Sequence, residues 1–152
     1  VKLNRSGMPP DSARRLPEIL RLARYYETAA ELAAEAASAR GEGETPLREA
    51  EEFRYAALAL LDLCGDIAGS TETTRIAMAR ETVESAYQNL KGGLLEAGGQ
   101  EFLPVNTMDA QLRAASSLRR ALDQVAKAAN MPAEPRRHHA SSRTEDGGGM
   151  AP

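Results

Sequence analysis

The chain has few aromatic residues, with no tryptophan, two phenylalanines and four tyrosines among its 152 residues. The core must therefore be filled by aliphatic side chains and alanine, which favours closely packed helices over a sheet sandwich. Alanine is also the strongest helix former, so the composition satisfies both requirements. The scarcity of aromatic residues predicts an all-α protein, and the length suits one domain with a modest core.

Cysteine and histidine are also scarce. The one cysteine, Cys64, excludes an internal disulfide and fits a reducing compartment, so we expect a cytoplasmic protein. The two histidines, His138 and His139, are adjacent and have no cysteine or carboxylate cluster at metal-ligand spacing. A nucleophilic mechanism needs a general base near the nucleophile. We therefore expect no metal, no cofactor and no catalytic residue, and a protein that is not an enzyme.

The sequence has neither a strong charge excess nor a long apolar run. Its formal net charge is −3, and phosphate backbones are bound by clusters of uncompensated basic residues. The longest strictly apolar run, Ala56 to Leu61, is much shorter than the roughly 20 residues that span a bilayer. The polar N-terminus does not have the pattern of a signal peptide. We expect neither nucleic acid nor a membrane as a partner.

Four segments carry apolar residues at steps of three and four, the spacing of one helix face. The first predicted helix begins at Asp11 or Pro17 and ends before Gly41, with an apolar stripe at Leu16, Ile19, Leu20, Ala23, Tyr26, Ala30, Ala33 and Ala36. The second covers residues 46–68, with an apolar face at Phe53, Ala57, Leu60, Leu61, Cys64, Ile67 and Ala68.

The third predicted helix starts at Ser70 or Thr71 and ends at the glycine pair Gly98 and Gly99. Its face has near-heptad spacing that requires a neighbouring helix, at Ile76, Ala79, Val83, Tyr87, Leu90 and Leu94. The fourth follows Pro104, with Asn106 or Thr107 as its N-cap, and ends near residue 130. It directs toward the core Met108, Leu112, Ala115, Leu118, Leu122, Val125 and Ala129.

These segments define the expected domain organisation. Residues 1–10 are a flexible leader, residues 11–130 form a helical bundle or long hairpin, and residues 131–152 form a disordered tail. The tail has too few apolar side chains to offset the entropy cost of ordering it. The carboxylates of residues 49–52 are interpreted as a solvated helix start. Tyr25 and Tyr26 are interpreted as packing residues that would suit an interface if they were exposed.

The segment from Phe53 to Ala115 resembles the helical core of the GrpE family, the nucleotide exchange factors of Hsp70 chaperones. "LALLDLCGDIAGS" is similar to a family motif of the form "LLPVLDNLERAL", and "ETVESAYQNLKGGLLEAGGQEF" is similar to the helix that follows it. "TMDAQLRAAS" is similar to "FDPxLHEAV", with Met108, Asp109, Leu112 and Ala115 at matching positions. Where the family continues into a small β-domain, this chain continues as a fourth helical segment.

The resemblance implies a GrpE-like cochaperone that binds an Hsp70 ATPase domain and modulates its nucleotide release. It implies a homodimer, with an interface at Ile76, Val83, Tyr87, Leu90 and Leu94. It also implies that Gly98, Gly99, Met108, Asp109 and Leu112 form the junction that precedes the β-domain in the family. The alternative is a non-catalytic helical adaptor or structural interaction protein with no chaperone role.

Overall fold

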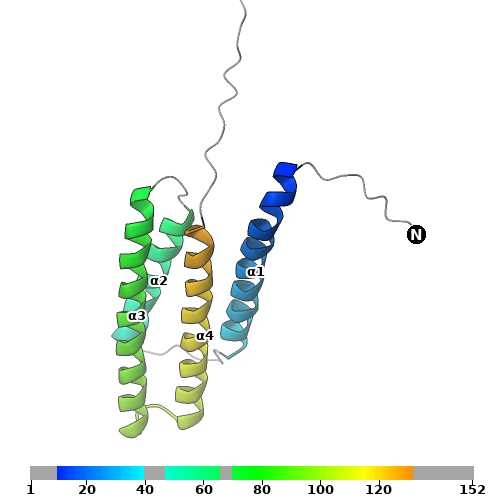
Figure 1. Ribbon diagram of the computed structural model, residues 1–152. Helices are drawn as coiled ribbons and strands as arrows, with labels where there is room; N and C mark the ends of the chain where they lie inside the picture. The colour runs from blue at the N-terminus through cyan, green and yellow to red at the C-terminus, as the bar shows by residue number, and fades with distance from the viewer. Residues whose placement is uncertain (1–9, 40–46, 66–69, 132–152) are drawn as a thin grey trace, which may run out of the picture.

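The computed structural model describes residues 10–39, 47–65 and 70–131, and this part of the chain consists of four α-helices with no strand (Figure 1). The helices are α1 (Pro10–Ala39), α2 (Arg48–Gly65), α3 (Ser70–Gly99) and α4 (Val105–Ala129). The predicted all-α class is therefore confirmed. None of the described helices combines the length and apolar character that a membrane span requires.

Most helix boundaries agree with the glycine and proline signals, but Pro17, predicted as a possible start of the first helix, lies inside α1, and one cap also differs. Helix α3 continues through Gly92 and Gly93 and ends at Gly99, as predicted. Helix α4 begins directly after Pro104, which occupies the N-cap position without a side-chain cap. The side chain of Asn106 accepts a hydrogen bond from the N–H of Thr107, at 2.9 Å, inside the first turn. The prediction of Asn106 or Thr107 as N-cap is therefore wrong, because proline already fixes the backbone at the helix start.

Helices α2, α3 and α4 enclose the main core. The apolar faces predicted for α2 and α3 meet there, and α4 completes the bundle. Phe53 of α2 packs against Tyr87 of α3, with ring centroids 6.1 Å apart. The largest buried side chains are Leu60 and Leu94, and the core contains mostly alanine and aliphatic residues, as the low aromatic content required.

Helix α1 lies outside this three-helix core. Among the described helices it packs against α4 alone, on the side of α4 away from α2 and α3 (Figure 1). Ala29 and Leu32 of α1 are buried, as are three small residues of α4 that are not part of the main core, Ser117, Ala121 and Ala128. Small side chains allow two helices to approach closely. Helix α4 therefore has two packed faces, whereas α1 has one.

The apolar stripe predicted on α1 does not face the core. Seven of its eight residues are exposed, and only Ala36 is half-buried. The face that packs on α4 instead carries Leu22, Tyr25, Ala29, Leu32 and Ala36. Helix α1 therefore has apolar residues on two sides, and the sequence pattern alone identified the side that no other described helix covers.

The predicted leader and tail lie almost entirely outside the described residues, which include only Pro10 and Met131 of them. His138 and His139 lie outside as well. The same holds for the ends predicted for α2, at residues 46 and 66–68.

Candidate interaction surface

The residues predicted to form a dimer interface on α3 lie inside a single chain. Ile76, Val83, Leu90 and Leu94 are between 0% and 6% exposed, and Tyr87 is half-buried at the edge of the same core. The neighbouring helix that their heptad spacing requires is supplied by α2 and α4 of the same chain. A dimer through these five side chains would require the bundle to open, so an interface must be sought elsewhere.

The predicted junction residues form a tight, closely packed turn between α3 and α4. The N–H groups of Phe102 and Leu103 donate to the carbonyl oxygen of Ala97, at 3.0 and 3.2 Å. Glu101 adopts a left-handed backbone conformation with φ of 61°. A Cβ atom on Gly98 would overlap Sδ of Met108 and lie 3.4 Å from its Cγ. Gly98 therefore allows the start of α4 to pack against the end of α3.

The other junction residues have ordinary structural environments. Leu112 and Met108 are half-buried and pack against the main core. Asp109 forms an exposed ion pair with Arg113, one turn later in α4, at 2.9 Å. Gly99 is exposed, and a Cβ there would contact nothing within 4 Å. The structure thus gives the junction a role in connecting two helices.

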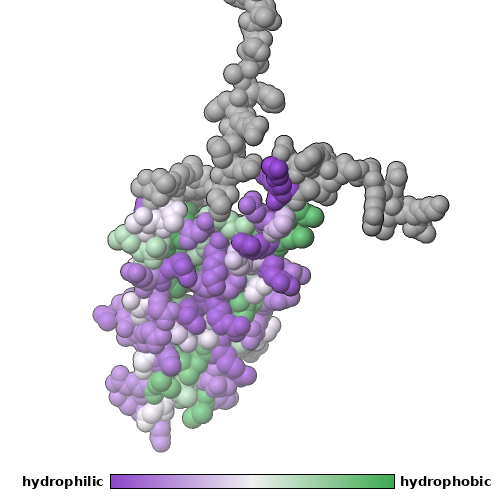
Figure 2. All heavy atoms as spheres, viewed as in Figure 1, coloured by the Kyte–Doolittle hydropathy of each residue, from purple (hydrophilic) through white to green (hydrophobic). Residues whose placement is uncertain are grey.

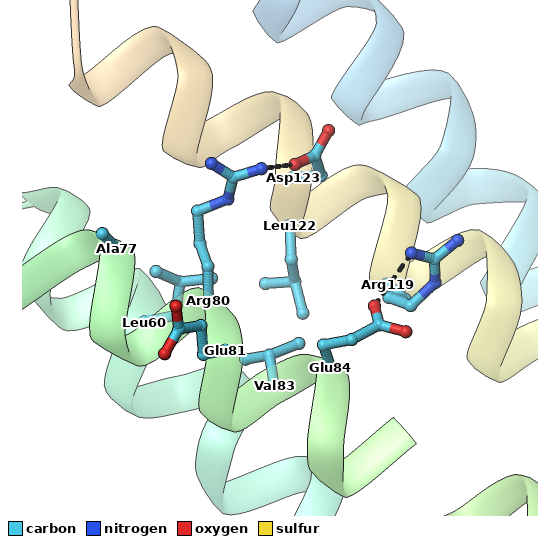
Figure 3. A pocket seen from close by; sticks show the side chains of 9 residues that line it. All are labelled: Leu60, Ala77, Arg80, Glu81, Val83, Glu84, Arg119, Leu122 and Asp123. Atoms are coloured by element: carbon cyan, nitrogen blue, oxygen red, sulfur yellow. Dashed lines mark hydrogen bonds and ion pairs between the residues drawn. The ribbon is translucent and has the colours of Figure 1, made fainter. Parts of the chain in front are cut away.

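A polar groove of about 350 Å³ lies between α3 and α4 (Figure 3). Its apolar floor includes Leu60, Val83 and Leu122. At one end Arg80 reaches from α3 to the carboxylate of Asp123, which Lys127 also contacts at 2.7 Å. At the other end, a guanidinium nitrogen of Arg119 lies 3.0 Å from a carboxylate oxygen of Glu84.

These ion pairs lower the pKa values of both carboxyl groups. For Asp123, burial acts to raise the pKa, but the hydrogen bond from Lys127 and the charge of Arg80 outweigh it. For Glu84, the main cause is a hydrogen bond from Gln88, at 2.8 Å, followed by the contact with Arg119. The lowered pKa makes both carboxylates weaker bases, which suits them to ion pairing better than to proton abstraction.

The groove serves to hold α3 and α4 together. The guanidinium of Arg119 also stacks over the ring of Tyr87, 5.1 Å from its centroid, and the ring in turn contacts Phe53 in the core. The Nε atom of Arg119 is buried without a hydrogen-bond partner in the described chain. Four of the five charged residues that line the groove, all except Glu81, form ion pairs between the two helices.

Cys64 is buried in the core at 7% exposure. Burial raises the pKa of its thiol, so the side chain stays neutral and unreactive at physiological pH. Within the described ranges, no group of three or more histidine, cysteine, aspartate or glutamate side chains is placed to hold a metal ion.

Exposed apolar side chains gather in three places, and those on α1 form the longest row. Tyr55, Leu58 and Leu61 lie on the outside of α2, and a second group of Leu95, Phe102 and Val105 lies around the α3–α4 turn. We call the row on α1 the outer stripe, which consists of Leu16, Ile19, Leu20, Ala23, Tyr26, Ala30, Ala33 and Ala37. Its members recur at steps of three and four, so they lie along one side of α1. Figure 2 shows apolar surface over the first half of this helix.

Sequence reasoning therefore found the outer stripe, with Ala36 in place of Ala37, but did not establish whether another helix covers it. The period of the apolar residues was sufficient to locate it. A second apolar row on the same helix, the one that packs on α4, was the sequence signal that the outer stripe could stay exposed. That second row has fewer large side chains than the outer stripe. Comparison of the chain with protein-family models, with curated proteins and with solved structures gave no match.

Proposed function

We propose that this protein is a helical interaction module that works by binding a partner helix along the outer stripe of α1. The observation that carries this proposal is the exposure of large apolar side chains on that stripe. Ile19, Leu20 and Tyr26 are 53%, 60% and 46% exposed. A helix that buries one apolar face and leaves a second one in water gains free energy when another helix covers the second face.

The composition of the outer stripe suits a protein contact. Contiguous exposed apolar rows on soluble proteins usually mark binding surfaces, whereas single exposed residues are ordinary. Tyr26 lies at the middle of the row and provides the kind of aromatic anchor that dominates binding energy in interfaces. The α3–α4 ion pairs and Cys64 are accounted for by the stability of the bundle, and the exposed apolar groups on α2 and at the α3–α4 turn are shorter than the row on α1.

The resemblance of residues 53–115 to the GrpE core leads to a more specific proposal: this protein binds an Hsp70 ATPase domain and modulates the release of its nucleotide. Its assay is stopped-flow release of a fluorescent ADP analogue from the Hsp70 encoded by the same genome, with and without this protein. Faster release would assign a cochaperone role. An unchanged rate would reject that role and leave the general binding proposal intact, because binding through α1 does not depend on the Hsp70 contact.

The direct test of the general proposal is site-specific photo-crosslinking in the cells that produce the protein. A benzoylphenylalanine residue replaces Ile19 on the outer stripe, and in a matched control it replaces Leu58, which is 49% exposed on the outside of α2. The proposal predicts a discrete adduct from position 19 and none of comparable yield from position 58. Equal adduct yields, or no adduct from position 19, would refute it.

A further inference from the structure

We infer that the partner of the outer stripe is a second copy of this chain, bound with its α1 antiparallel to the first. The inference rests on the proposed function and specifies its partner. Three properties of α1 support it: the packing of the helix on one neighbour, the order of its large and small side chains, and the order of its charges.

Helix α1 is covered on one side only. Its packed side, which includes Ala29 and Leu32, faces α4, and no other described helix contacts it. The outer stripe is centred about a third of a helical turn away from that face, since successive residues rotate by about 100°. A second α1 can therefore lie along the stripe without disturbing the contact with α4. Two copies would then form a continuous layer in the order α4, α1, α1 and α4.

Large and small side chains are segregated along the stripe. The first half carries Leu16, Ile19 and Leu20, whereas the second half carries only alanines, at positions 30, 33 and 37. In an antiparallel pair, the large residues of each copy lie against the alanines of the other, so the helix axes stay at one spacing along their length. A parallel pair would place leucine against leucine at one end and alanine against alanine at the other. The size order therefore favours the antiparallel arrangement.

Charges are segregated in the same way. Residues 10–26 contain four arginines, at 14, 15, 21 and 24, and two acids, Asp11 and Glu18. Residues 27–39 contain three glutamates, at 27, 31 and 35, and no basic residue. In an antiparallel pair, the basic half of each helix faces the acidic half of the other. A parallel pair would instead bring like charges together, which destabilises an interface.

The position of these charges beside the stripe allows them to meet. Arg24, Glu27 and Glu31 are spaced by three and four residues, so they lie along the same edge of the stripe. All three are exposed. An antiparallel pair centred between residues 26 and 27 places Arg24 of each copy beside Glu27 and Glu31 of the other.

The dipole of α1 does not explain this charge order. A helix dipole favours acids near the N-terminus and bases near the C-terminus, and apart from Asp11 the order in α1 is the opposite. The charge segregation is accounted for by a second α1.

Sedimentation equilibrium of the full chain tests the partner with two charge-reversed variants. The acidic variant carries Arg24→Glu, and the basic variant carries Glu27→Arg and Glu31→Arg. Wild type should have twice the 16.3 kDa mass of one chain. Each variant alone should dimerise on the order of tenfold more weakly, because like charges face each other at both ends of the pair. An equimolar mixture should recover the dimer, because an acidic α1 then faces a basic one.

The design separates loss of pairing from loss of folding. All three substituted residues are exposed, so the substitutions remove no buried contact. Far-ultraviolet circular dichroism should therefore be unchanged. A wild-type chain with the mass of a monomer, or variants that do not restore each other in the mixture, would overturn the inference.

Orientation is tested by disulfide formation in a background in which Cys64 is replaced by alanine. Chains with Ala23→Cys should crosslink efficiently with chains that carry Ala30→Cys, and poorly with themselves. Efficient crosslinking of Ala23→Cys chains with one another would overturn the antiparallel arrangement.

The photo-crosslinking experiment distinguishes failure of this inference from failure of the proposed function. An adduct from position 19 that contains two copies of this chain supports both. An adduct with a different protein retains the binding function and overturns self-pairing, and the absence of an adduct refutes both.

Discussion

At the scale of single residues, two glycines of α3 have different environments and should respond differently to the same substitution. A Cβ on Gly92 would contact nothing within 4 Å, whereas one on Gly98 would overlap the sulfur of Met108. Gly92→Ala should raise the free energy of unfolding by about 1 kcal/mol, because alanine is the better helix former. Gly98→Ala should raise it less, since Met108 must move. Urea denaturation of the two variants measures the difference.

A double-mutant cycle with Met108→Ala isolates the steric part of this effect. In that background the Gly98→Ala substitution should become more favourable by roughly the amount that the clash costs, because the overlapping sulfur is gone. Gly92→Ala should have the same effect in both backgrounds. An equal effect of Gly98→Ala with and without Met108 would show that the close packing at this junction has no energetic consequence.

Cys64 provides a second prediction at this scale. Its side chain is buried and the pKa of its thiol is raised by desolvation, so little reactive thiolate is exposed in the folded chain. Reaction with an aromatic disulfide reagent at pH 8 should be slow in buffer and rapid in denaturing urea. Rapid reaction in buffer would mean that α2 opens readily or that Cys64 is not part of the core.

At the scale of helices, the ion pairs between α3 and α4 make a prediction about acid stability. Because the pKa of Asp123 is lower in the folded chain than its ordinary value, this group stabilises the fold above about pH 4. That contribution is lost as the pH falls through the folded-state pKa. Asp123→Asn should therefore cost about 1 kcal/mol at pH 7 and less at pH 3, measured by urea denaturation.

The matched control is Asp109→Asn, which removes an exposed pair within α4 rather than a contact between helices. The side chains of Asp109 and Arg113 are 59% and 67% exposed, whereas that of Asp123 is 30% exposed. The control should have a smaller effect at pH 7. A cost for Asp123→Asn that stays constant between pH 7 and pH 3, or that equals the control, would contradict a role for this group in joining the helices.

The helices themselves were largely predictable from the sequence, because glycine and proline mark their ends and apolar periodicity marks their faces. The face of α3 through Ile76, Val83, Leu90 and Leu94 was located correctly, but its neighbour was not. Periodicity shows that a helix must lie alongside, and it does not show whether that helix belongs to the same chain. Alanine adds to the difficulty, because an alanine row packs equally well on either side of a helix such as α1.

Contacts between residues far apart in the chain could not be predicted from a single sequence. The pairs of Arg80 with Asp123 and of Glu84 with Arg119 join residues 43 and 35 positions apart. Nothing in local composition distinguishes these charges from the exposed ones around them. The close approach of Gly98 to Met108 is similar, since the glycine was predicted as a helix end and its packing role depends on the angle between α3 and α4.

At the scale of the whole molecule, the described chain is a three-helix core with a fourth helix on its outside. This arrangement explains why one apolar row remains uncovered, because α1 contacts α4 alone. The side chains and charges that are segregated along α1 lie on a surface away from the core. The central claim is therefore that a partner helix covers the outer stripe when the protein functions in the cell.

Hydroxyl-radical footprinting of the full chain, in the cells that produce it and after purification, tests that claim most directly. Tyr26 on the outer stripe and Tyr55 on α2 are 46% and 63% exposed in the isolated chain, so they serve as probe and internal reference. If a partner covers the stripe, oxidation of Tyr26 relative to Tyr55 should fall several-fold below the ratio of these exposures. With self-pairing, the ratio should also fall as the concentration of purified protein rises. Oxidation of both tyrosines in proportion to their exposure under every condition would contradict the account.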